Sequence, residues 1–596
     1  MSPRARVGIL IGVMGLMTLA LVGRIFSIAV LSHDSYLAKA KEQQQVERDI
    51  LPRRGSLYVQ DASNGTSVVV AQSIERFALS ATPKNVIRKE EYARVLSQIS
   101  GVEEARLRSS FDKSGWYMEP FMHNLDKSQV EEIAQKIWEI EKAHKAVFKP
   151  VNVNFDSAQG DVIHYLGGVF FVREYERVYP ETALLGQVLG FVNDKGKGQY
   201  GFEGQYDAEL KGYAGRVSLE QDSRGTALKE FQQVDGQDGT SYELTIDRNV
   251  QQVVEQELKK QVEDSEAKSG SVIVMDPKTG GIIAMANYPS YAPAEFRNLG
   301  KDQIGLFDNP SISSVWEPGS IFKPLIMSGA LDQGLVTPNT TDVFGASVNV
   351  DGYTITTALD KAFGKESMTD VLTNSDNVAM VWLGEKMGNT MMGDYLSRFG
   401  FGSQTGIDLK NEISGKVNPP QRWSNILRAT TTFGQGIAVT PLQITSAYAS
   451  IANNGVLMQP HVVKAAISSD GVRTETKVAA GKQVLKPQTA TDMRNMLTAV
   501  VVHNHKRAGV EGYKVGGKTG TAQVPDPDKP GYIENAYNHS FAGMAPADDP
   551  RYVMLVKIDQ PNLEKVGRFA EGTAVPLFGR ISRFLLHYYQ IPPTNK

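Results

Sequence analysis

An apolar run near the N-terminus constrains this chain more than any other feature of its sequence. The seventeen residues from Val7 to Gly23 carry no charge, and counting on to Leu31 gives twenty-five residues with a single arginine. A helix needs about 20 mostly apolar residues to cross a bilayer. The alternative, a cleaved signal peptide, has an apolar region of roughly 7–15 residues. The length of the run therefore favours an uncleaved transmembrane helix.

The arginines beside this run predict its direction in the membrane. Arg4 and Arg6 precede it, and the positive-inside rule places them in the cytoplasm. Arg24 lies near the far interface, where its long side chain can carry the charge out of the lipid. We therefore expect a cytoplasmic tail at residues 1–6, a single-pass anchor in contact with membrane lipid at 7–31, and the bulk of the chain on the outer side.

The composition excludes several classes of function. The chain has 596 residues, 63 of them Lys or Arg and 66 Asp or Glu, for a formal net charge of −3. It lacks the basic excess expected of a protein that binds nucleic acid. It has no cysteine, which excludes disulfides, thiolate nucleophiles and cysteine-ligated zinc. The length predicts two or three domains.

The chain after the anchor is predicted to contain two regions, with a change of pattern near Gly239. The first region, residues 32–240, mixes short apolar alternations, glycines and helical stretches, as expected for a mixed, β-rich domain. Its predicted segments are a helical stalk at 33–49, strands around an Asn-Gly turn at 52–72, short helices at 87–149 and alternating strands at 151–215.

The second region, residues 241–596, has strands at both ends and helices in its middle. The stretch LTIDRNVQQVVEQELKKQVED predicts a strand, a cap at Asp247 and an amphipathic helix. The other predicted segments are a hairpin at 270–290, a helix-rich middle at 321–454, strands at 513–524 and 551–559, and a last amphipathic helix at 575–589. This order predicts an α+β domain with helices packed on an antiparallel sheet.

The stretch WEPGSIFKP places Ser320 and Lys323 three residues apart behind a Pro-Gly turn. At the start of a helix the two side chains share a face, and the helix dipole favours negative charge beside the serine. Lys323 can act as a base only if burial or a neighbouring positive charge lowers its pKa. The alternative is a helix cap followed by a surface lysine, and Ser-x-x-Lys alone does not decide between the two.

A second polar triplet, Ser375-Asp376-Asn377, lies in the sequence VLTNSDNVAMVWLG. A serine hydroxyl can relay a proton, and an asparagine amide can both donate to and accept from a peptide. The alternative is a helix N-cap, for which Ser, Asp and Asn are the favoured residues.

The third motif is Lys518-Thr519-Gly520-Thr521, within YKVGGKTGTAQV. Three glycines weaken a strand interior, but they suit a strand along which a ligand's backbone lies close and pairs. Lys518 would supply positive charge, and the hydroxyls of Thr519 and Thr521 would bind a carboxylate. The alternative is a weakened edge strand with an exposed lysine.

Ser-x-x-Lys, Ser-x-Asn and Lys-Thr-Gly, in this order, are the signature of serine acyl-transferases that react with β-lactams. The chain resembles the penicillin-binding proteins, specifically the membrane-anchored, monofunctional class B transpeptidases of the FtsI type. The segments 270–290 and 433–455 resemble their transpeptidase domain, and several stretches before residue 215 resemble their pedestal, or dimerisation, domain. The resemblance implies a pedestal at 32–240 and a transpeptidase domain at 241–596. It is least clear over 87–149, and Val59-Gln60-Asp61 departs from the family's usual Asp-Arg-Asn-Gly.

The resemblance also implies a mechanism that needs no metal and no organic cofactor. The substrates would be peptidoglycan stem peptides, and β-lactams would be covalent inhibitors. Its implied roles are Ser320 as nucleophile, Lys323 as general base, Ser375 as proton relay, Asn377 as ligand of the substrate amide, Lys518 as the charge that polarises Ser375, and Thr519, Gly520 and Thr521 as the substrate-binding strand. The backbone amides of Ser320 and Thr521 would form the oxyanion hole.

The resemblance favours a D,D-transpeptidase of septal wall synthesis in the plasma membrane of a bacterium. Glu317 before Pro-Gly-Ser, together with Lys-Thr-Gly, is typical of the division type. Elongation-type transpeptidases, D,D-carboxypeptidases, β-lactamases and a catalytically silent scaffold of the same fold remain alternatives. The first region lacks the Glu-Asp-x-x-Phe-x-x-His pattern of wall glycosyltransferases, so the expected partners are a SEDS-type, FtsW-like glycosyltransferase and other division proteins.

His503-x-His505 resembles a metal-binding pair. No carboxylate or third histidine lies near it in the sequence, so we predict a solvated loop and no metal.

Overall fold

The computed structural model describes residues 2–36, 45–112, 118–144, 162–166, 168–221 and 227–593. They fall into two compact units, each built from separate stretches of the chain. The first unit comprises Met1–Arg54, Ser73–Glu176 and Lys211–Gly239, and the second comprises Gly55–Gln72, Arg177–Leu210 and Thr240–Lys596. The boundary that we placed between residues 240 and 241 stays a prediction.

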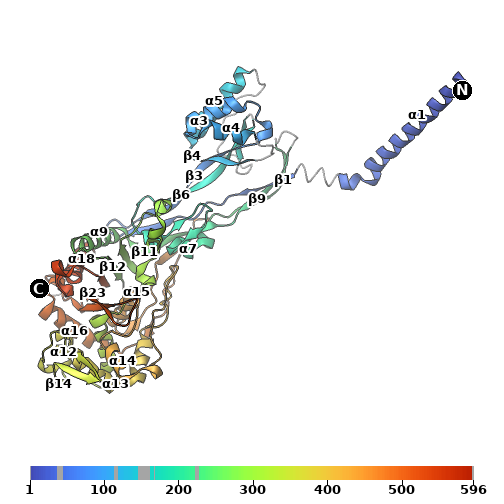
Figure 1. Ribbon diagram of the computed structural model, residues 1–596. Coiled ribbons are helices and arrows are strands. Elements are labelled where there is room, and N and C mark those ends of the chain that lie inside the picture. The colour runs from blue at the N-terminus through green and yellow to red at the C-terminus, as the bar shows by residue number, and fades with distance from the viewer. Residues whose placement is uncertain are drawn as a thin grey trace. The chain divides into compact units, whose positions relative to one another are not determined.

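The apolar N-terminus forms one long helix. Helix α1 spans Pro3–Phe26 and continues as a π-helical turn, η1, over Ser27–Leu31. An 18-residue window of this segment has a mean hydropathy of 2.2. No residue of α1 (labelled in Figure 1) or of η1 is buried. The segment is long and apolar enough to cross a membrane, as the sequence predicts.

The predicted helical stalk at 33–49 is wrong at its C-terminal end. Residues 37–44 of this prediction lie outside the described part of the chain. Gln45–Ile50 is a strand, β1, which pairs antiparallel with β9, Gly215–Gln221. Pairing with a strand far along the chain outweighs local helix propensity here, and β10, Ala227–Val234, completes the sheet.

The short helices predicted over 87–149 are confirmed. They are α3, Lys89–Ser100, α4, Glu104–Phe111, and α5, Lys127–Ala143. The sequence did not predict the strand between them, β4, Met118–Leu125, which pairs with β3, Thr66–Ala81. The other elements of this unit are η2, Pro83–Asn85, β5, Val162–Leu166, and most of β6, Val169–Val178.

The second unit is built around a five-stranded antiparallel sheet. Its order is β13-β12-β24-β23-β22. The strands are β12, Ser269–Met275, β13, Ile282–Tyr288, β22, Gly516–Pro525, β23, Tyr532–Ala545, and β24, Tyr552–Asp559. The predicted hairpin at 270–290 is therefore confirmed, as are the two predicted strands near the C-terminus.

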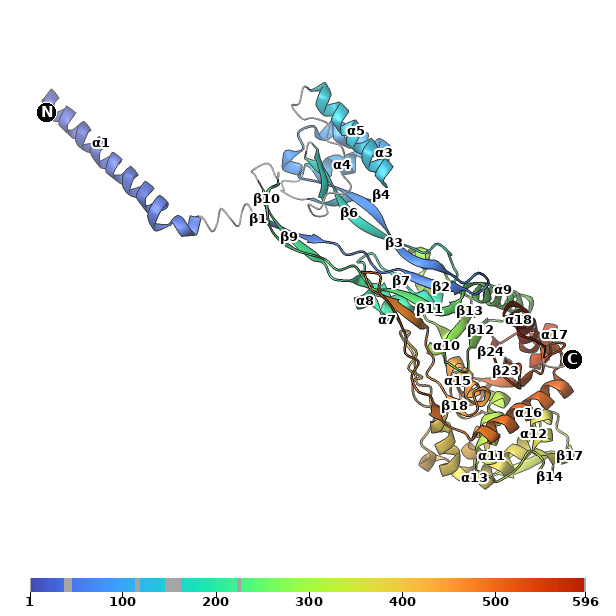
Figure 2. The same ribbon diagram turned by 180° about the vertical axis from the view of Figure 1, so that it is seen from behind.

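Helices cover both faces of this sheet (Figures 1 and 2). Met554 and Val556 of β24 point into one core, shared with α9, Arg248–Asp264, and α18, Ala574–Tyr588. Their neighbour Leu555 points into a second core. That core is shared with α11, Lys323–Asp332, α15, Pro441–Ala452, and α16, Pro487–Asn504. Because β24 is buried on both sides, its sequence is a nearly continuous apolar run rather than an alternation of apolar and polar residues.

A second sheet precedes the long helix α9. Strand β11, Ser241–Asp247, pairs parallel with β2, Leu57–Asp61, and antiparallel with β19, Val463–Ile467. Asp247 then caps α9 by accepting hydrogen bonds from the amides of Asn249 and Val250, as predicted. The predicted Asn-Gly turn joins β2 to β3.

The helix-rich middle of the chain also contains strands that the sequence did not predict. They are β14, Thr341–Phe344, β15, Ser347–Val350, β16, Tyr353–Thr356, and β17, Gly364–Ser367. The remaining longer helices are α12, Met368–Asn374, α13, Asn377–Arg398, and α14, Asn425–Thr431. Helices on an antiparallel sheet confirm the predicted α+β class.

The shorter elements of this unit connect the parts already described. The helical ones are α6, Gly186–Leu189, α7, Gly201–Gln205, α8, Asp207–Lys211, η3, Pro293–Asn298, η4, Lys301–Phe307, α10, Pro310–Ser313, η5, Gly319–Phe322, η6, Pro420–Arg422, η7, Lys506–Ala508, α17, Leu563–Val566, and η8, Ala570–Gly572. The strands are β7, Phe191–Val192, β8, Gly198–Gln199, β18, Val456–Leu457, β20, Arg473–Glu475, and β21, Lys482–Gln483.

Candidate active site

Ser320 lies in a tight turn that leads into a buried helix. Gly319 has a φ of 61°, a left-handed conformation that glycine adopts without strain. The 3-10 turn η5 then carries Ser320 and runs directly into α11, which begins at Lys323. The predicted helix start is confirmed. The amide of Gly319 donates to the carbonyl of Gly434 over 3.1 Å, and the hydroxyl of Tyr448 donates to the carbonyl of Ile321 over 2.7 Å, so the turn is held from two sides.

Lys323 is completely buried, which excludes a surface lysine. Its Nζ donates to the carbonyl of Ser375 over 2.6 Å and contacts the Ser375 hydroxyl at 3.1 Å. Burial, and then the positive charge of Lys518, hold the pKa of Lys323 well below its usual value, and the carboxyl groups of Asp376 and Glu366 only partly offset them. A lysine in this state can accept a proton.

The Ser375-Asp376-Asn377 motif joins two helices, and each of its three residues has a different structural role. Asp376 caps α13 by accepting from the amide of Ala379 over 2.9 Å, so the N-cap interpretation holds for this residue. Ser375 ends α12 with φ 55° and ψ 42°, a conformation that is costly for a residue with a side chain. Asn377 donates one amide hydrogen to the carbonyl of Thr356, which leaves its second hydrogen and its oxygen for a ligand.

Strand β22 carries the third motif at the edge of the central sheet. Thr519 and Thr521 are two residues apart and so lie on one face of the strand; both are partly exposed. Gly520 allows this strand to meet the Ser320 turn, because a Cβ there would lie 2.4 Å from the Ser540 hydroxyl and 3.0 Å from the Pro318 carbonyl. Packing inside the protein therefore already requires this glycine.

Lys518 is buried next to these threonines and is not the exposed lysine of the alternative interpretation. Its side chain is 1% exposed, and Nζ lies 3.4 Å from the Thr519 hydroxyl oxygen. Burial lowers the pKa of Lys518 to about 8, although Glu571 acts in the opposite direction. Burial thus lowers the affinity of both amines, Lys323 and Lys518, for protons, and the charge of Lys518 lowers that of Lys323 further.

The structure brings the three motifs together but does not form every contact that the sequence suggests. Within the described residues, Lys323 is the amine that contacts Ser375, and neither Lys518 nor Ser320 makes a side-chain hydrogen bond to it. The hydroxyls of Ser320, Thr519 and Thr521 remain partly exposed beside β22.

Two buried carboxyl groups near Ser375, those of Glu366 and Asp376, were not predicted from the sequence as a pair. Glu366 on β17 is 1% exposed and Asp376 is fully buried, and within the described residues one oxygen of each has no hydrogen-bond partner. Burial raises the pKa of Glu366 to about 7; a hydrogen bond from Asn374 opposes this shift, and Asp376 adds to it. The raised pKa favours a protonated Glu366 beside the Asp376 side chain. Nothing in the sequence around Glu366 indicates this pairing.

The prediction that His503 and His505 form a solvated loop is wrong for His505. His503 is exposed, but His505 is 5% exposed. Its Nδ1 lies 3.0 Å from the Glu571 carboxylate, and its Nε2 lies 3.4 Å from the Thr519 hydroxyl oxygen. Helix α16 ends at Asn504, and the next turn directs this ring inward. The described residues contain no group of three or more potential metal ligands.

Glu317, just before the Pro-Gly turn, joins the start of β23 and the segment at Gly436 to the turn. It accepts from the amide of Gly436 over 2.8 Å and from the hydroxyl of Tyr532 over 2.9 Å. Burial raises the pKa of Glu317, and these two donors partly offset the shift.

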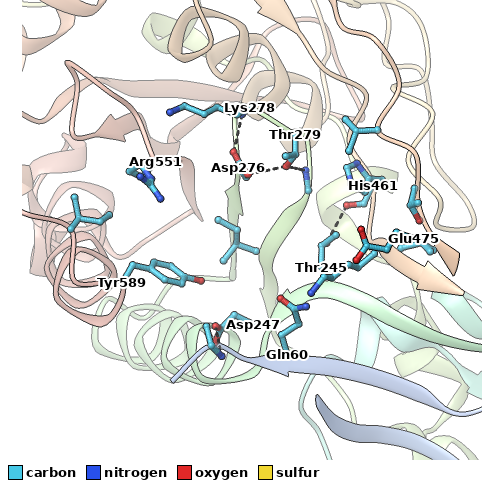
Figure 3. A pocket seen from close by; sticks show the side chains of 18 residues that line it. Gln60, Thr245, Asp247, Asp276, Lys278, Thr279, His461, Glu475, Arg551 and Tyr589 are labelled. Atoms are coloured by element: carbon cyan, nitrogen blue, oxygen red, sulfur yellow. Dashed lines mark hydrogen bonds between the residues drawn. The ribbon is translucent and has the colours of Figure 1, made fainter. Parts of the chain in front are cut away.

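A cavity of about 630 Å³ elsewhere in the second unit is lined by none of the residues of the three motifs. Figure 3 shows Asp276, Lys278, Arg551 and Tyr589 around it. Charges of both signs line this cavity, so it does not define one class of ligand.

Comparison with known families agrees with the fold. Residues 270–583 match the penicillin-binding protein transpeptidase domain, and residues 49–244 match the penicillin-binding protein dimerisation domain. The chain belongs to the class B penicillin-binding proteins.

Individual relatives cover most of the chain. It is 31% identical to the penicillin-binding protein PbpB of Mycobacterium tuberculosis, over 94% of this chain and 82% of that protein. It is 31% identical to the peptidoglycan D,D-transpeptidase FtsI of Escherichia coli, over 72% of this chain and 70% of that protein. Among solved structures, penicillin-binding protein 3 of Mycobacterium tuberculosis in complex with aztreonam superposes with a TM-score of 0.64 at 33% identity, covering 71% of this chain and 93% of that one.

Proposed function

We propose that this protein is a serine-type peptidoglycan D,D-transpeptidase that forms an acyl-enzyme at Ser320. The observation that carries the proposal is the buried Lys323, which follows Ser320 by one helical turn and contacts the Ser375 hydroxyl. A relative with 31% identity bears the name of this activity.

Acylation begins when the Ser320 hydroxyl attacks the carbonyl between the two terminal D-alanines of a stem peptide. Neutral Lys323 takes the hydroxyl proton, and the backbone amides of Ser320 and Thr521 hold the oxyanion. The carbon–nitrogen bond then breaks, and the leaving D-alanine takes a proton through Ser375 from Lys323. An amine of a second stem peptide attacks the ester in the reverse sense, which forms the crosslink and releases Ser320.

The other residues of the site bind the donor peptide. Asn377 faces its amide with the second hydrogen of the side chain. Thr519 and Thr521 bind the terminal carboxylate, with Lys518 supplying positive charge, and the peptide pairs along the edge strand β22 at Gly520. β-Lactams present a carboxylate and a strained carbonyl to the same groups and so acylate Ser320.

In the cell, we place this activity in septal wall synthesis. Helix α1 anchors the protein in the plasma membrane with its N-terminus in the cytoplasm, because Arg4 and Arg6 precede the apolar run. The expected partners are an FtsW-like, SEDS-type glycosyltransferase and other division proteins. The relative named FtsI supports the division role.

The full-length protein in detergent, incubated with a fluorescent penicillin, tests the activity. Stable label on the wild-type protein and none on Ser320→Ala is the expected result. Label that survives Ser320→Ala would contradict the assignment of the nucleophile, and rapid spontaneous release would indicate a β-lactamase. Crosslinking of a stem-peptide donor to an amine acceptor separates a transpeptidase from a carboxypeptidase or a silent scaffold. A tagged copy at the lateral wall instead of the septum would favour the elongation type.

A further inference from the structure

The ring of His505 lies between a carboxylate and a threonine of the candidate substrate-binding strand. Nδ1 is 3.0 Å from Glu571 and Nε2 is 3.4 Å from the hydroxyl oxygen of Thr519. The ring is 5% exposed, and the Phe541 ring packs against it edge-on at 6.1 Å. Its position is therefore fixed by contacts on three sides.

Glu571 is itself held in place by a second histidine. His539 on β23 donates from Nε2 to the carbonyl of Arg568 over 2.8 Å, and its Nδ1 accepts from the hydroxyl of Thr573 over 2.9 Å. Burial lowers the pKa of His539 to about 4, so this ring is neutral, as the two bonds require. Arg568 and Thr573 flank Glu571 in the chain, and their bonds to His539 hold the Glu571 turn against the sheet.

Glu571 is a carboxylate in spite of its surroundings. Burial acts to raise the pKa of Glu571, but the side-chain contact and charge of His505 and the charge of Lys518 outweigh it, and the pKa is lowered. The carboxylate lies 3.0 Å from Nδ1 of His505, an ion-pair distance without hydrogen-bond geometry among the described residues. The other nitrogen, Nε2, faces Thr519.

We propose that His505 and Glu571 are positioning residues that aim the hydroxyl hydrogen of Thr519 at the terminal carboxylate of the substrate. This inference rests on the proposed function. A hydroxyl has one hydrogen to donate. When Thr519 donates it to a ligand carboxylate, the hydrogen is no longer available to Nε2, and the hydroxyl oxygen is left facing His505 and Lys518. The ring of His505, held next to Glu571, therefore limits the directions in which the Thr519 hydroxyl can point.

The charged groups around the ring fit this arrangement. Glu571 on η8 and Lys518 on β22 lie beside it, Lys506 and Arg507 follow it on its own segment, and β23 contributes the Phe541 ring. The carboxylate of Glu571 acts to raise the pKa of Lys518 and so favours its charged form. Without this pair, Thr519 would be free to donate elsewhere, and a ligand carboxylate would lose one directed hydrogen bond.

The test compares a ligand that has the carboxylate with one that lacks it. Full-length protein is acylated with benzylpenicillin or with its methyl ester, and the second-order rate constant is measured by mass spectrometry of the intact protein. His505→Phe should slow acylation by benzylpenicillin about tenfold, the effect of losing about 1.4 kcal/mol, and should change the rate with the ester less than twofold. Glu571→Gln should likewise slow acylation by benzylpenicillin and leave the rate with the ester almost unchanged. His505→Gln, which keeps a donor near Thr519, should restore most of the rate.

A double variant separates positioning from general damage to the fold. In a Thr519→Ala background, His505→Phe should have no further effect on benzylpenicillin, because the residue through which it acts is gone. Equal losses with both ligands, or a full additional loss in the Thr519→Ala background, would overturn the inference. If His505→Phe lowers the melting temperature, Glu571→Gln, which keeps the shape of the side chain, decides the question. Wild type that fails to be acylated by either ligand would instead overturn the proposed function.

Discussion

Lys323 donates to the backbone carbonyl of Ser375 over 2.6 Å and contacts its hydroxyl at 3.1 Å. One buried amine thus connects the first motif to the second. The contact fixes a proton path between the residue that would be acylated and the residue that would serve the leaving group.

Replacing this amine should abolish acylation without harming the fold. Lys323→Met should lower the rate of acylation by penicillin by about 10²–10⁴, the usual contribution of a general base. Because burial of the amine is costly, the melting temperature should stay equal or rise. The rate is measured by stopped-flow labelling, and a fall in melting temperature together with the loss of rate would point to a structural role.

The acylation rate should depend on pH in a bell-shaped manner. Because the pKa of Lys323 is lowered, its neutral form becomes available as pH rises, and the acylation rate rises with it. This rise is the acidic limb of the profile. Lys518 loses its charge as pH rises through about 8, so binding of a carboxylate ligand should weaken above that value. Lys518→Arg, whose charge persists, should move the alkaline limb to higher pH. An unchanged limb would show that another group titrates there.

The carboxyl pair Glu366–Asp376 should make the protein less stable as pH rises. The pKa of Glu366 is raised from its usual 4.5 to about 7, so the protonated form is favoured in the fold. The stability it contributes is complete below pH 4.5 and is lost as pH rises through about 7. Glu366→Gln should therefore raise the melting temperature at pH 8 by about 2 °C, and should not raise it at pH 4. Glu385→Gln, at an exposed position, is the matched control and should show neither effect.

Gly520 should not tolerate even one methyl group. The added Cβ would meet the Ser540 hydroxyl at 2.4 Å and the Pro318 carbonyl at 3.0 Å. Gly520→Ala should cost about 1–3 kcal/mol of stability and shift the Ser320 turn, with at least a tenfold loss of acylation. Gly516→Ala is the matched control on the same strand, because its Cβ would have no neighbour closer than 3.4 Å. Ser540→Gly should partly rescue Gly520→Ala, and failure to rescue would place the clash at Pro318.

Local patterns predicted many of the elements but not the contacts between those distant in sequence. The Asp247 cap, the hairpin at 270–290 and the helix start at Ser320 depend on near neighbours, and the structure confirms them. Strand β1 was taken for helix because its partner, β9, lies far along the chain.

In the candidate active site, too, contacts between residues distant in sequence were not predicted. The order of the three motifs indicated their residues, yet His505 was assigned to solvent because its partners, Thr519 and Glu571, are distant in sequence. The Glu366–Asp376 pair escaped for the same reason. Whether a histidine or a carboxylate is buried is decided by tertiary packing, which leaves no local pattern.

The pairing of β12 with β24 has a consequence for how the protein is made. β12 begins at Ser269 and β24 ends at Asp559, so the middle of the central sheet joins the first of its strands to be synthesised to the last. Strand order of this kind makes folding slow. During synthesis, Ser320 emerges long before Lys518. The hairpin of β12 and β13 is complete long before β24, so until then the edge of β12 that pairs with β24 has no partner. A nascent chain should therefore be inert toward penicillin until almost all of it has emerged, and most prone to aggregate just before that point.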